Sequence, residues 1–213
     1  MQTAIQHFNI HYPVAQDNDF ATWKAFKNQY WPAEYLIGRD GNIIYKHFGE
    51  GNYDHTENAI REALGLSGAV TKDNVAKKGS IRSPEMYFNL VRLKNLTPEQ
   101  SASTQSKKYT LPQHIALNNF ALAGEWQFGN DHAELIKGTG KIQLHFSSGK
   151  LFMVASSDKP VTLQIMVDGK PQPAITVNTS QLYTLFDSDE YRDHNVDIEI
   201  PSAGFQAFTF TFG

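Results

Sequence analysis

Alternating apolar and polar residues in the second half constrain the fold of this 213-residue chain more than any other feature. The alternation is clearest at Val161, Leu163, Ile165 and Val167, and an Asp168-Gly169 turn follows. The stretches "GKIQLHFSS", "QLYTLFD", "NVDIEIPS" and "QAFTFTFG" alternate in the same way. Short runs with this period, separated by turn residues, predict an all-β antiparallel sandwich over residues 111–213.

Residues 1–66 show a mixed pattern that predicts the element order α, β, α, β, β, α. "HYPVAQD" is typical of a short strand, and "DFATWKAFKNQY" predicts a helix with Asp19 at its N-cap. "AEYLIGRDGNIIYKHFG" predicts a β-hairpin that turns at Asp40-Gly41. "NYDHTENAIREALGL" predicts an amphipathic helix. Its expected buried stripe is Ala59, Ile60, Ala63 and Leu64.

Residues 67–110 separate these two regions. "SGAVTKDNVAKKGSIRSPE" is rich in Lys, Ser and Gly, which is typical of a linker. "SPEMYFNLVRLKNL" favours a short helix or a turn. We therefore expect three parts: residues 1–66, a linker with a short helix over residues 67–110, and the sandwich over residues 111–213.

The composition excludes several classes of function. The chain has no cysteine, so these residues cannot form a disulfide, a thiolate metal site or a catalytic dithiol. The net charge of −3 gives no strong field for nucleic acid or an anionic membrane. The sequence contains no apolar run of the roughly 20 residues that cross a bilayer. The first residues lack the basic and apolar segments of a signal peptide, so we expect none in this chain.

No local motif predicts a catalytic residue, a metal ligand or a cofactor site. The eight histidines lack metal-ligand spacing, and the "GTGK" stretch at residues 138–141 leads into a strand, which favours a turn over a phosphate-binding loop. Asp187, Asp189 and Glu190 are interpreted as a solvated loop, because closeness in sequence does not place two carboxylates across a sugar.

The stretch "YWPAEYLI" carries the strongest local hypothesis. A proline cannot donate a hydrogen bond to a β-ladder, so Pro32 marks the start of a strand. A cis peptide bond at Trp31-Pro32 would in addition present the flanking backbone to an incoming extended chain. From the spacing alone both interpretations stay open.

Residues 9–64 resemble the C-terminal half of a thioredoxin-like domain of the DipZ and TlpA type of thiol–disulfide proteins, which are related to the cytochrome c biogenesis thioredoxins. The matching elements are "YPVAQDND", "WKAF", "YWPAEYLI", the Asp-Gly hairpin and the "HFGEG" stretch. The later part resembles the β-sandwich extension of DipZ-type proteins, which is similar to carbohydrate-binding modules with a jelly-roll fold. The matching pieces there are "SPEMY", "LAGEW", "VDGKP", "LYTL" and "QAFTFTFG".

The resemblance implies an α/β partial thioredoxin-like fold followed by the sandwich. It makes Trp31, Pro32 and Ala33 a substrate-binding platform that faces a Cys-x-x-Cys dithiol, and it implies an extracytoplasmic location and protein disulfide substrates. The dithiol and at least one central strand of the family lie upstream of the matching residues, so we expect a truncated domain that is inactive alone in thiol–disulfide exchange. Its open strand edges and apolar faces would pair with a separately encoded Cys-x-x-Cys half, with a second copy, or with the sandwich.

The alternative hypothesis is a non-catalytic module whose sandwich binds a glycan or a protein. Aromatic rings that stack on sugar faces would be the first candidates, and these are Trp126, Tyr183 and Tyr191. For Trp126 a core position between the two sheets is the favoured interpretation. A third hypothesis is a non-functional remnant of a split gene.

Overall fold

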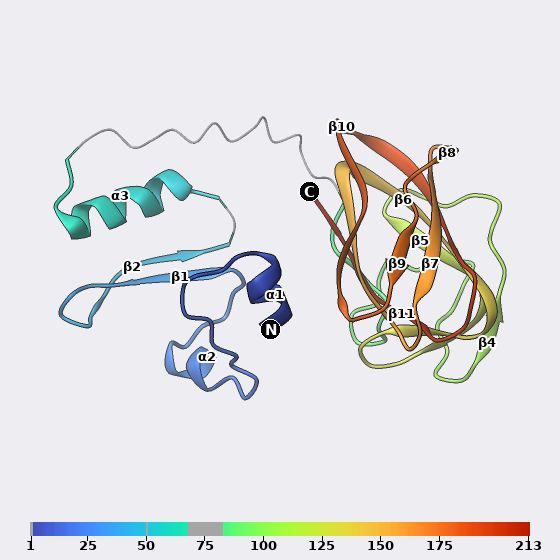
Figure 1. Cartoon of the computed structure of the whole chain (residues 1–213), viewed down its shortest axis with the longest axis horizontal. Helices are drawn as coiled ribbons and strands as arrows, with labels where there is room; N and C mark the ends of the chain where they lie inside the picture. Colours follow the sequence, from blue (N-terminus) through green and yellow to red (C-terminus); the bar gives the residue numbers. More distant parts are fainter. Residues whose placement is uncertain (1, 50, 68–82) are drawn as a thin grey trace. The chain divides into compact units, whose positions relative to one another are not determined.

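The computed structural model describes residues 2–49, 51–67 and 83–213. The chain divides into two compact units, Met1–Val75 and Ala76–Gly213 (Figure 1). We call the first the N-terminal unit and the second the sandwich unit. Each is described by itself below.

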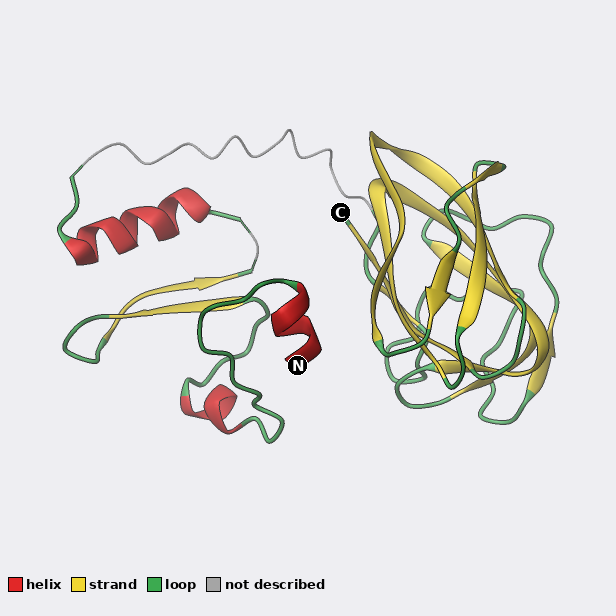
Figure 2. Cartoon of the chain, viewed as in Figure 1, coloured by secondary structure: helices red, strands yellow, loops and turns green. Residues whose placement is uncertain are grey.

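The sandwich unit consists of antiparallel strands packed in layers (Figures 1 and 2). The strands are β3 (Met86–Tyr87), β4 (Lys107–Tyr109), β5 (Asn119–Phe128), β6 (Ala133–Ser157), β7 (Val161–Val167), β8 (Lys170–Pro171), β9 (Ile175–Val177), β10 (Gln181–Ile200) and β11 (Phe205–Phe212). Every pair between these strands is antiparallel, which confirms the predicted all-β antiparallel region. The finer jelly-roll assignment stays a prediction.

The long strands β6 and β10 take part in both layers. Residues 140–148 of β6 pair with residues 192–200 of β10, and residues 150–155 of β6 pair with residues 181–187 of the same strand. The register shifts between Asp187 and Arg192, where the two strands bend. β4, β5 and β7 extend the first stretch, and β3 and β11 extend the second. One continuous network of backbone hydrogen bonds therefore connects the layers.

The core of the sandwich unit follows from the period-two pattern. Along β7 the side chains alternate strictly between buried and exposed, as the sequence predicts. The largest fully buried side chains include Trp126, Phe88, Phe120, Phe128, Phe146, Phe205 and Phe210. Burial of each large apolar side chain stabilises the fold by roughly 1.5–3 kcal/mol, so the unit has a substantial core of its own.

The sandwich begins earlier in the chain than the sequence predicts. Of the short helix or turn predicted in "SPEMYFNLVRLKNL", the helix is wrong, because Met86–Tyr87 forms β3 and pairs with β11, and residues 90–92 form a turn. Phe88 is fully buried, and its ring lies 4.3 Å from that of Phe120 and 5.1 Å from that of Phe210 between centroids. Residues 83–110 therefore belong to the sandwich unit and not to a linker. Residues 68–82 of the predicted linker lie outside the described residues.

The N-terminal unit is a β-hairpin with three helices. Its elements are α1 (Gln2–His7), α2 (Ala21–Ala25), β1 (Ala33–Ile37), β2 (Ile43–Phe48) and α3 (Tyr53–Leu64). The hairpin and the helices agree with the sequence analysis, but the strand predicted in "HYPVAQD" is not formed. A strand needs a partner to hydrogen-bond with, and β1 and β2 pair with each other alone among the described residues. None of the described helices is long and apolar enough to span a bilayer.

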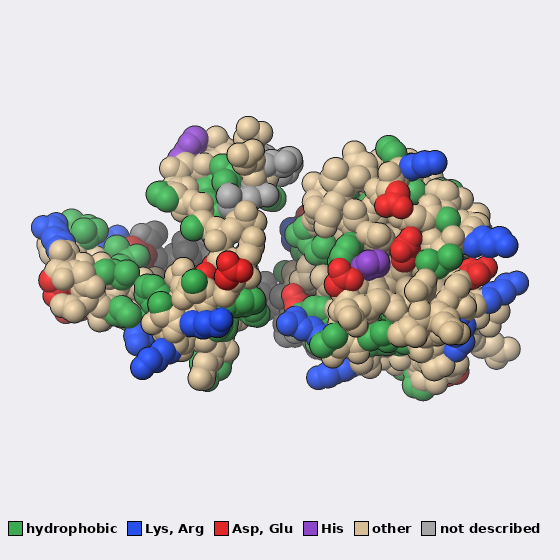
Figure 3. Space-filling view, turned by 90° about the horizontal axis from the view of Figure 1, so that it is seen from below, with side chains coloured by type: hydrophobic (Ala, Val, Ile, Leu, Met, Phe, Trp, Pro, Cys, Tyr) green, Lys and Arg blue, Asp and Glu red, His purple; other side chains and the backbone are tan. Residues whose placement is uncertain are grey.

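No described side chain of the N-terminal unit is buried. The stripe predicted as the buried face of α3 is open, since Ile60 is 40% and Leu64 53% exposed. That prediction is therefore wrong for the described fold, because too little of the unit packs over that face of the helix. Figure 3 shows apolar side chains on the surface of this unit among the charged ones.

Candidate functional site

The Trp31-Pro32-Ala33 segment lies where the chain enters β1. The Trp31–Pro32 peptide bond is cis, as the resemblance implies. The Gly49 N–H donates a hydrogen bond of 2.9 Å to the Pro32 carbonyl, which closes the end of the hairpin beside the proline. Trp31 is 67% exposed. The segment is therefore presented to solvent, and its role in substrate binding stays a prediction.

Aromatic side chains hold this segment on the hairpin. The Trp31 ring lies against Trp23, with centroids 4.5 Å apart. Tyr35 packs edge-on against Phe26 at 4.9 Å, and its hydroxyl donates a hydrogen bond of 3.0 Å to Asn28 Oδ1. Ring pairs of this kind add about 0.5–1.5 kcal/mol each beyond the area they bury. They support the hairpin in a unit in which no described side chain is buried.

An apolar cavity of about 370 Å³ opens in the N-terminal unit. Its lining includes Ala15 and Trp23 from the segment before the hairpin, and Tyr35 and Ile37 from β1. β1 has β2 on one side, and no other described strand pairs with it. The cavity and the open strand edge together leave room for further polypeptide on this unit.

Asp17 shapes one wall of this cavity. Its carboxylate accepts hydrogen bonds from the backbone N–H groups of Trp23 at 2.8 Å and Thr22 at 2.9 Å, at the start of α2. These bonds, that from Trp23 first, lower the pKa of Asp17. Asp17 therefore fills the role at this helix start that the sequence predicts for Asp19.

Two of the three rings predicted to bind a ligand in the sandwich are core residues. Trp126 is fully buried and its indole N–H donates a hydrogen bond of 2.8 Å to the Ala123 carbonyl. Tyr183 is only 7% exposed, and its hydroxyl donates a hydrogen bond of 2.8 Å to the Thr179 carbonyl. Neither ring can stack on a sugar, so both predictions of a ligand contact are wrong, and the core interpretation of Trp126 is confirmed. Tyr191 is 41% exposed and stays a prediction.

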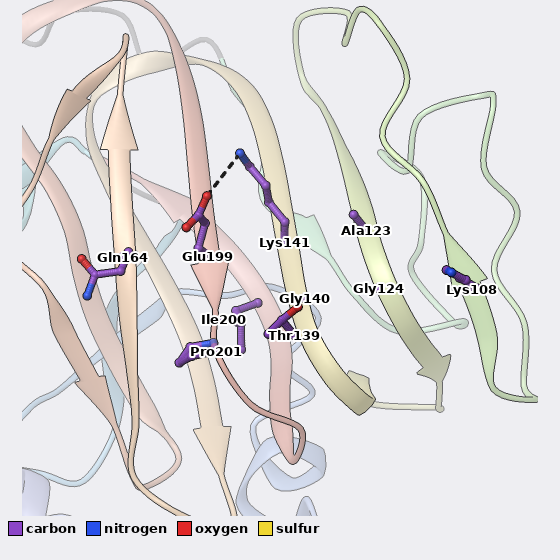
Figure 4. Close-up of a pocket in the computed structure, with 10 residues that line it drawn as sticks. All are labelled: Lys108, Ala123, Gly124, Thr139, Gly140, Lys141, Gln164, Glu199, Ile200 and Pro201. Atoms are coloured by element: carbon purple, nitrogen blue, oxygen red, sulfur yellow. Dashed lines mark ion pairs between the residues drawn. The ribbon is translucent and has the colours of Figure 1, made fainter.

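The sandwich unit instead carries an open groove of about 630 Å³ (Figure 4). Figure 4 shows that its side chains come from neighbouring strands: Lys108 from β4, Ala123 from β5, Lys141 from β6, Glu199 from β10 and Gln164 from β7. Backbone register places four of them in one row, because Ala123 pairs with Lys141, Lys141 with Glu199, and Glu199 with Gln164. The groove therefore runs across the strands.

Small residues of β5 and β6 make the groove hollow. The register of β5 and β6 shifts between Ala123 and Glu125, so Gly124 forms a bulge with a φ of +104°. A Cβ at Gly124 would meet the Thr139 carbonyl oxygen at 2.7 Å, which only glycine avoids. Gly140 has no room for a side chain either, since a Cβ there would lie 3.0 Å from the Trp126 ring. Trp126 thus supports the groove from beneath.

Paired charges line the middle of the groove. Lys141 Nζ lies 2.9 Å from Asp197 Oδ1 and 3.8 Å from Glu199 Oε1. Gln143 donates a further hydrogen bond of 2.7 Å to Asp197 Oδ1. Asp197 therefore holds the lysine in place, and Glu199 keeps most of its carboxylate surface open to solvent.

This groove was not predicted from the sequence. Thr139, Gly140 and Lys141 belong to the "GTGK" stretch that was interpreted as a turn, and all three line the groove. The available signal was the charged residues at outward positions of consecutive strands. Which of these stand in one row depends on strand register, which a single sequence does not reveal.

A buried histidine forms the other polar cluster of the sandwich unit. His194 is 1% exposed, and its Nδ1 lies 2.8 Å from Asp168 Oδ2. Burial disfavours the Asp168 carboxylate, but hydrogen bonds from the Asn195 backbone N–H, His194 and Arg192 outweigh it and lower the pKa of Asp168. The cluster ties β10 to the turn after β7. No group of three or more His, Asp or Glu within residues 2–49, 51–67 and 83–213 has a geometry suited to a metal ion.

Comparison with known proteins places the sandwich unit in a family. The model described as "Thioredoxin like C-terminal domain" matches residues 83–213, which is more than half of the chain and begins where the described sandwich begins. The chain belongs to the thioredoxin-like C-terminal domain family. The family match therefore supports the early start of the sandwich unit, and it leaves the thioredoxin-like fold of residues 1–66 a prediction.

Relatives of this thioredoxin-like C-terminal domain protein extend the similarity to the N-terminal unit. Protein DipZ of Mycobacterium tuberculosis and that of Mycobacterium bovis are each 29% identical over 216 residues, which covers 97% of this chain and 30% of the relative. The chain thus spans less than a third of the length of these relatives. NHL repeat-containing protein 2 of Bos taurus is 25% identical over 92 residues, covering 43% of this chain and 12% of that protein.

Solved structures show only a weak likeness to this family member. A family two carbohydrate esterase from Clostridium thermocellum, in complex with cellohexaose, has a TM-score of 0.42 and 21% identity, and covers 45% of this chain and 31% of its own. A family 43 arabinoxylan arabinofuranohydrolase from Bacillus subtilis has a TM-score of 0.33 and 14% identity, covering 84% of this chain and 32% of its own. TM-scores of this size carry no conclusion about ligand or activity.

Proposed function

We propose that this chain is the substrate-positioning part of an extracytoplasmic thiol–disulfide oxidoreductase of the DipZ and TlpA type. It would supply the Trp31-Pro32-Ala33 platform and an accessory β-sandwich. The catalytic dithiol would come from a Cys-x-x-Cys segment that these 213 residues do not contain. Alone, the chain would be inactive in disulfide exchange.

The observation that carries this proposal is the 29% identity to DipZ over 97% of the chain. The aligned length includes both units, so the similarity is not confined to the accessory domain. The position of Pro32 directly before β1 and the exposure of Trp31 agree with a surface that receives an extended peptide.

The exposed apolar surface of the N-terminal unit supports a requirement for a second polypeptide segment. Its helices and hairpin leave large apolar side chains exposed, among them Phe8, Tyr12, Ile44, Phe48, Ile60 and Leu64. Covering one such side chain is worth roughly 1.5–3 kcal/mol, so a strand and helix docked on this unit would gain a large stabilisation. We expect the Cys-x-x-Cys segment as the occupant, and a second copy of this chain is the competing outcome.

The chemistry would then divide between the two segments. A thiolate of the Cys-x-x-Cys segment attacks one sulfur of the substrate disulfide, and the other substrate sulfur leaves as a thiol. The second cysteine resolves the mixed disulfide, so the dithiol becomes oxidised and the substrate gains two thiols. The residues of this chain hold the substrate backbone beside the reacting sulfurs.

An insulin-reduction assay with dithiothreitol tests the proposal. The chain alone should give no turnover above the dithiothreitol background. Addition of a Cys-x-x-Cys strand–helix segment from a DipZ relative should raise the rate at least about tenfold over that of the segment alone, which corresponds to 1.4 kcal/mol. Clear turnover by the chain alone would contradict the assigned division of roles.

Two variants separate the platform from the rest of the chain. Trp31→Ala should lower the rate of the mixture, because it removes the exposed ring beside Pro32. Tyr191→Ala is the matched control, since it removes an exposed ring in the sandwich unit and should leave the rate unchanged. If the segment fails to bind while light scattering shows a stable dimer of this chain, the apolar surface is a homodimer interface and the proposed partner is wrong.

A second candidate function is a non-catalytic binding module that uses the sandwich for a glycan or a protein. The groove across β4, β5, β6, β10 and β7 favours it, because about 630 Å³ lies within the usual range of small-ligand sites. This function needs no thiol and is compatible with the first.

A further inference from the structure

The groove of the sandwich unit has a definite direction and length. It crosses five neighbouring strands, with Lys108 on β4 at one end and Gln164 on β7 at the other. Neighbouring strands lie about 4.8 Å apart, so four intervals give a groove of about 19 Å. A ligand that fills it must be extended and must lie across the strands.

The charges of the groove favour a neutral ligand. Lys141 is already neutralised by Asp197 and Glu199, at 2.9 and 3.8 Å. An anionic group placed beside Lys141 would meet the exposed Glu199 carboxylate. A cationic group placed beside Glu199 would meet the Lys141 ammonium, which lies 3.8 Å from that carboxylate. Either unpaired charge costs free energy, whereas a neutral group leaves the existing pairs intact.

The groove offers both hydrogen-bond donors and hydrogen-bond acceptors. Lys108 and Lys141 donate, the Glu199 carboxylate accepts, and Gln164 does both. The Lys141 ammonium and the Glu199 carboxylate lie 3.8 Å apart. A vicinal diol matches such a pair, because one hydroxyl can accept from the ammonium while its neighbour donates to the carboxylate. Ala123, beside Lys141 on β5, and Pro201, just after β10, add apolar surface to the lining.

We propose that this groove binds a neutral oligosaccharide that lies across the strands, with Lys141 and Glu199 on neighbouring hydroxyls of one sugar unit. Ala123 on β5 and Pro201 just after β10 lie on opposite sides of that pair, and they contact the C–H faces of the neighbouring sugar units. No aromatic ring lines the groove, so the ligand is held by hydrogen bonds and not by stacking. The proposal deepens the second candidate function and is independent of the thiol–disulfide proposal.

Titration of the full chain with defined hexasaccharides tests the site. The neutral probes are cellohexaose, maltohexaose and chitohexaose, each up to about 10 mM, which detects interactions of roughly −3 to −4 kcal/mol. Hexagalacturonate is the anionic counterpart, and the hexapeptide Gly-Ser-Gly-Ser-Gly-Ser is a neutral peptide of comparable length. Calorimetry gives the affinity, and shifts of the backbone amide NMR signals give the location.

At least one neutral hexasaccharide should bind and should shift the amide signals of Lys141, Glu199 and Gln164. Hexagalacturonate and the hexapeptide should bind at least about tenfold more weakly, a difference of 1.4 kcal/mol. The proposal is overturned if none of the three neutral sugars binds, if hexagalacturonate or the peptide binds as tightly, or if the shifted signals lie outside the groove.

Glu199→Gln keeps the shape of the side chain and removes its charge. It should weaken sugar binding about tenfold, because it removes a charge-assisted hydrogen bond. Glu190→Gln is the matched control, an exposed carboxylate beside Arg192 and outside the groove, and should leave the affinity within about twofold. Equal affinity of Glu199→Gln and the unchanged chain would also overturn the site.

Both variants should retain the unfolding temperature of the chain, because both carboxylates are largely exposed. They should also leave insulin reduction by the mixture with the Cys-x-x-Cys segment unchanged. Loss of sugar binding with intact insulin reduction, or the reverse, therefore assigns each failure to its own proposal.

Discussion

The two units of this chain differ in how far their apolar side chains are buried. In the sandwich unit many aromatic side chains point into the core, and Phe88, Phe120 and Trp126 are fully buried. In the N-terminal unit Phe8, Tyr12 and Trp31 are each more than 60% exposed, and no described side chain of that unit is buried. Amphipathic elements with uncovered faces indicate a surface that is completed by contact with another segment. By the same criterion, the apolar faces of the sandwich unit are already covered.

Amide hydrogen exchange gives the largest expected difference between the units. A fold with a full core opens at a cost of roughly 5–15 kcal/mol, whereas a hairpin without one opens at a small fraction of that cost. The amides of β6 and β10 should therefore exchange at least about a thousandfold more slowly than those of β1 and β2. Mass spectrometry of peptides from one exchanged sample measures both units together. Equal exchange rates in the two units would contradict the difference in burial between them.

Matched tryptophan substitutions test the comparison at single residues. Trp126→Ala removes a fully buried ring and should lower the free energy of unfolding of the sandwich unit by about 3–5 kcal/mol. Trp31→Ala removes a ring that is 67% exposed, so the free energy of unfolding of the N-terminal unit should fall by no more than about 1.5 kcal/mol, the upper value for its ring contact with Trp23. Urea unfolding followed by circular dichroism measures both. Similar losses from the two variants would show that the N-terminal unit also has a core.

Acid should lower the stability of the sandwich unit by protonating the Asp168 carboxylate. The folded-state pKa of Asp168 is lowered, so the stability from its carboxylate is present above the unfolded value of about 3.9 and is lost as the pH falls through the folded value. Asp168→Asn should cost roughly 1.5–3 kcal/mol at pH 7, the range for hydrogen bonds to charged groups. Unfolding curves from pH 7 to pH 2 should show that this difference shrinks below about pH 4.

Asp189→Asn is the control for that experiment, because Asp189 is an exposed carboxylate on β10, the strand that also carries His194. It should leave the pH dependence of unfolding unchanged. A difference between Asp168→Asn and the unchanged chain that stays constant down to pH 2 would contradict a contribution from the charged form.

Two glycines of the sandwich unit give the smallest expected effect. Gly124→Ala should destabilise the unit by about 1–3 kcal/mol, since its φ is +104° and the new Cβ meets the Thr139 carbonyl. Gly138→Ala has a φ of +67° but open space around the Cβ, so the cost should be about 1 kcal/mol. Thermal unfolding ranks the two. A larger loss at Gly138 would contradict the close approach of β5 and β6 beneath the groove.

Much of this fold was predictable because strand pleat and sequence alternation share one period. Val161, Leu163 and Ile165 indicated their inward direction without any knowledge of their neighbours, and the structure buries all three. Residues 83–110 offered no such alternation. Their place in the sandwich depends on the pairing of Met86 with Phe210, more than a hundred positions later, which local pattern does not encode.

The site was less predictable than the fold. Aromatic content indicated Trp126 and Tyr183 as ligand contacts, but a single ring in a strand does not reveal which face it occupies. The apolar stripe of α3 was predicted to be buried, but it is exposed. An amphipathic pattern indicates that a helix has an apolar face to cover, and it does not identify the segment that covers it. The residues that line the groove lie between positions 108 and 201 of the sequence, and only the register between strands brings them together.

The place of β11 has a consequence for how the sandwich unit acquires its structure. β11 is the last strand in the sequence, yet it lies between β3 and β6 and carries Phe205 and Phe210 into the core. During synthesis the sheet therefore stays open until residue 212 has emerged from the ribosome. Pairing of such distant segments is slow, so we expect a nascent sandwich whose unpaired edges need protection until the final strand inserts.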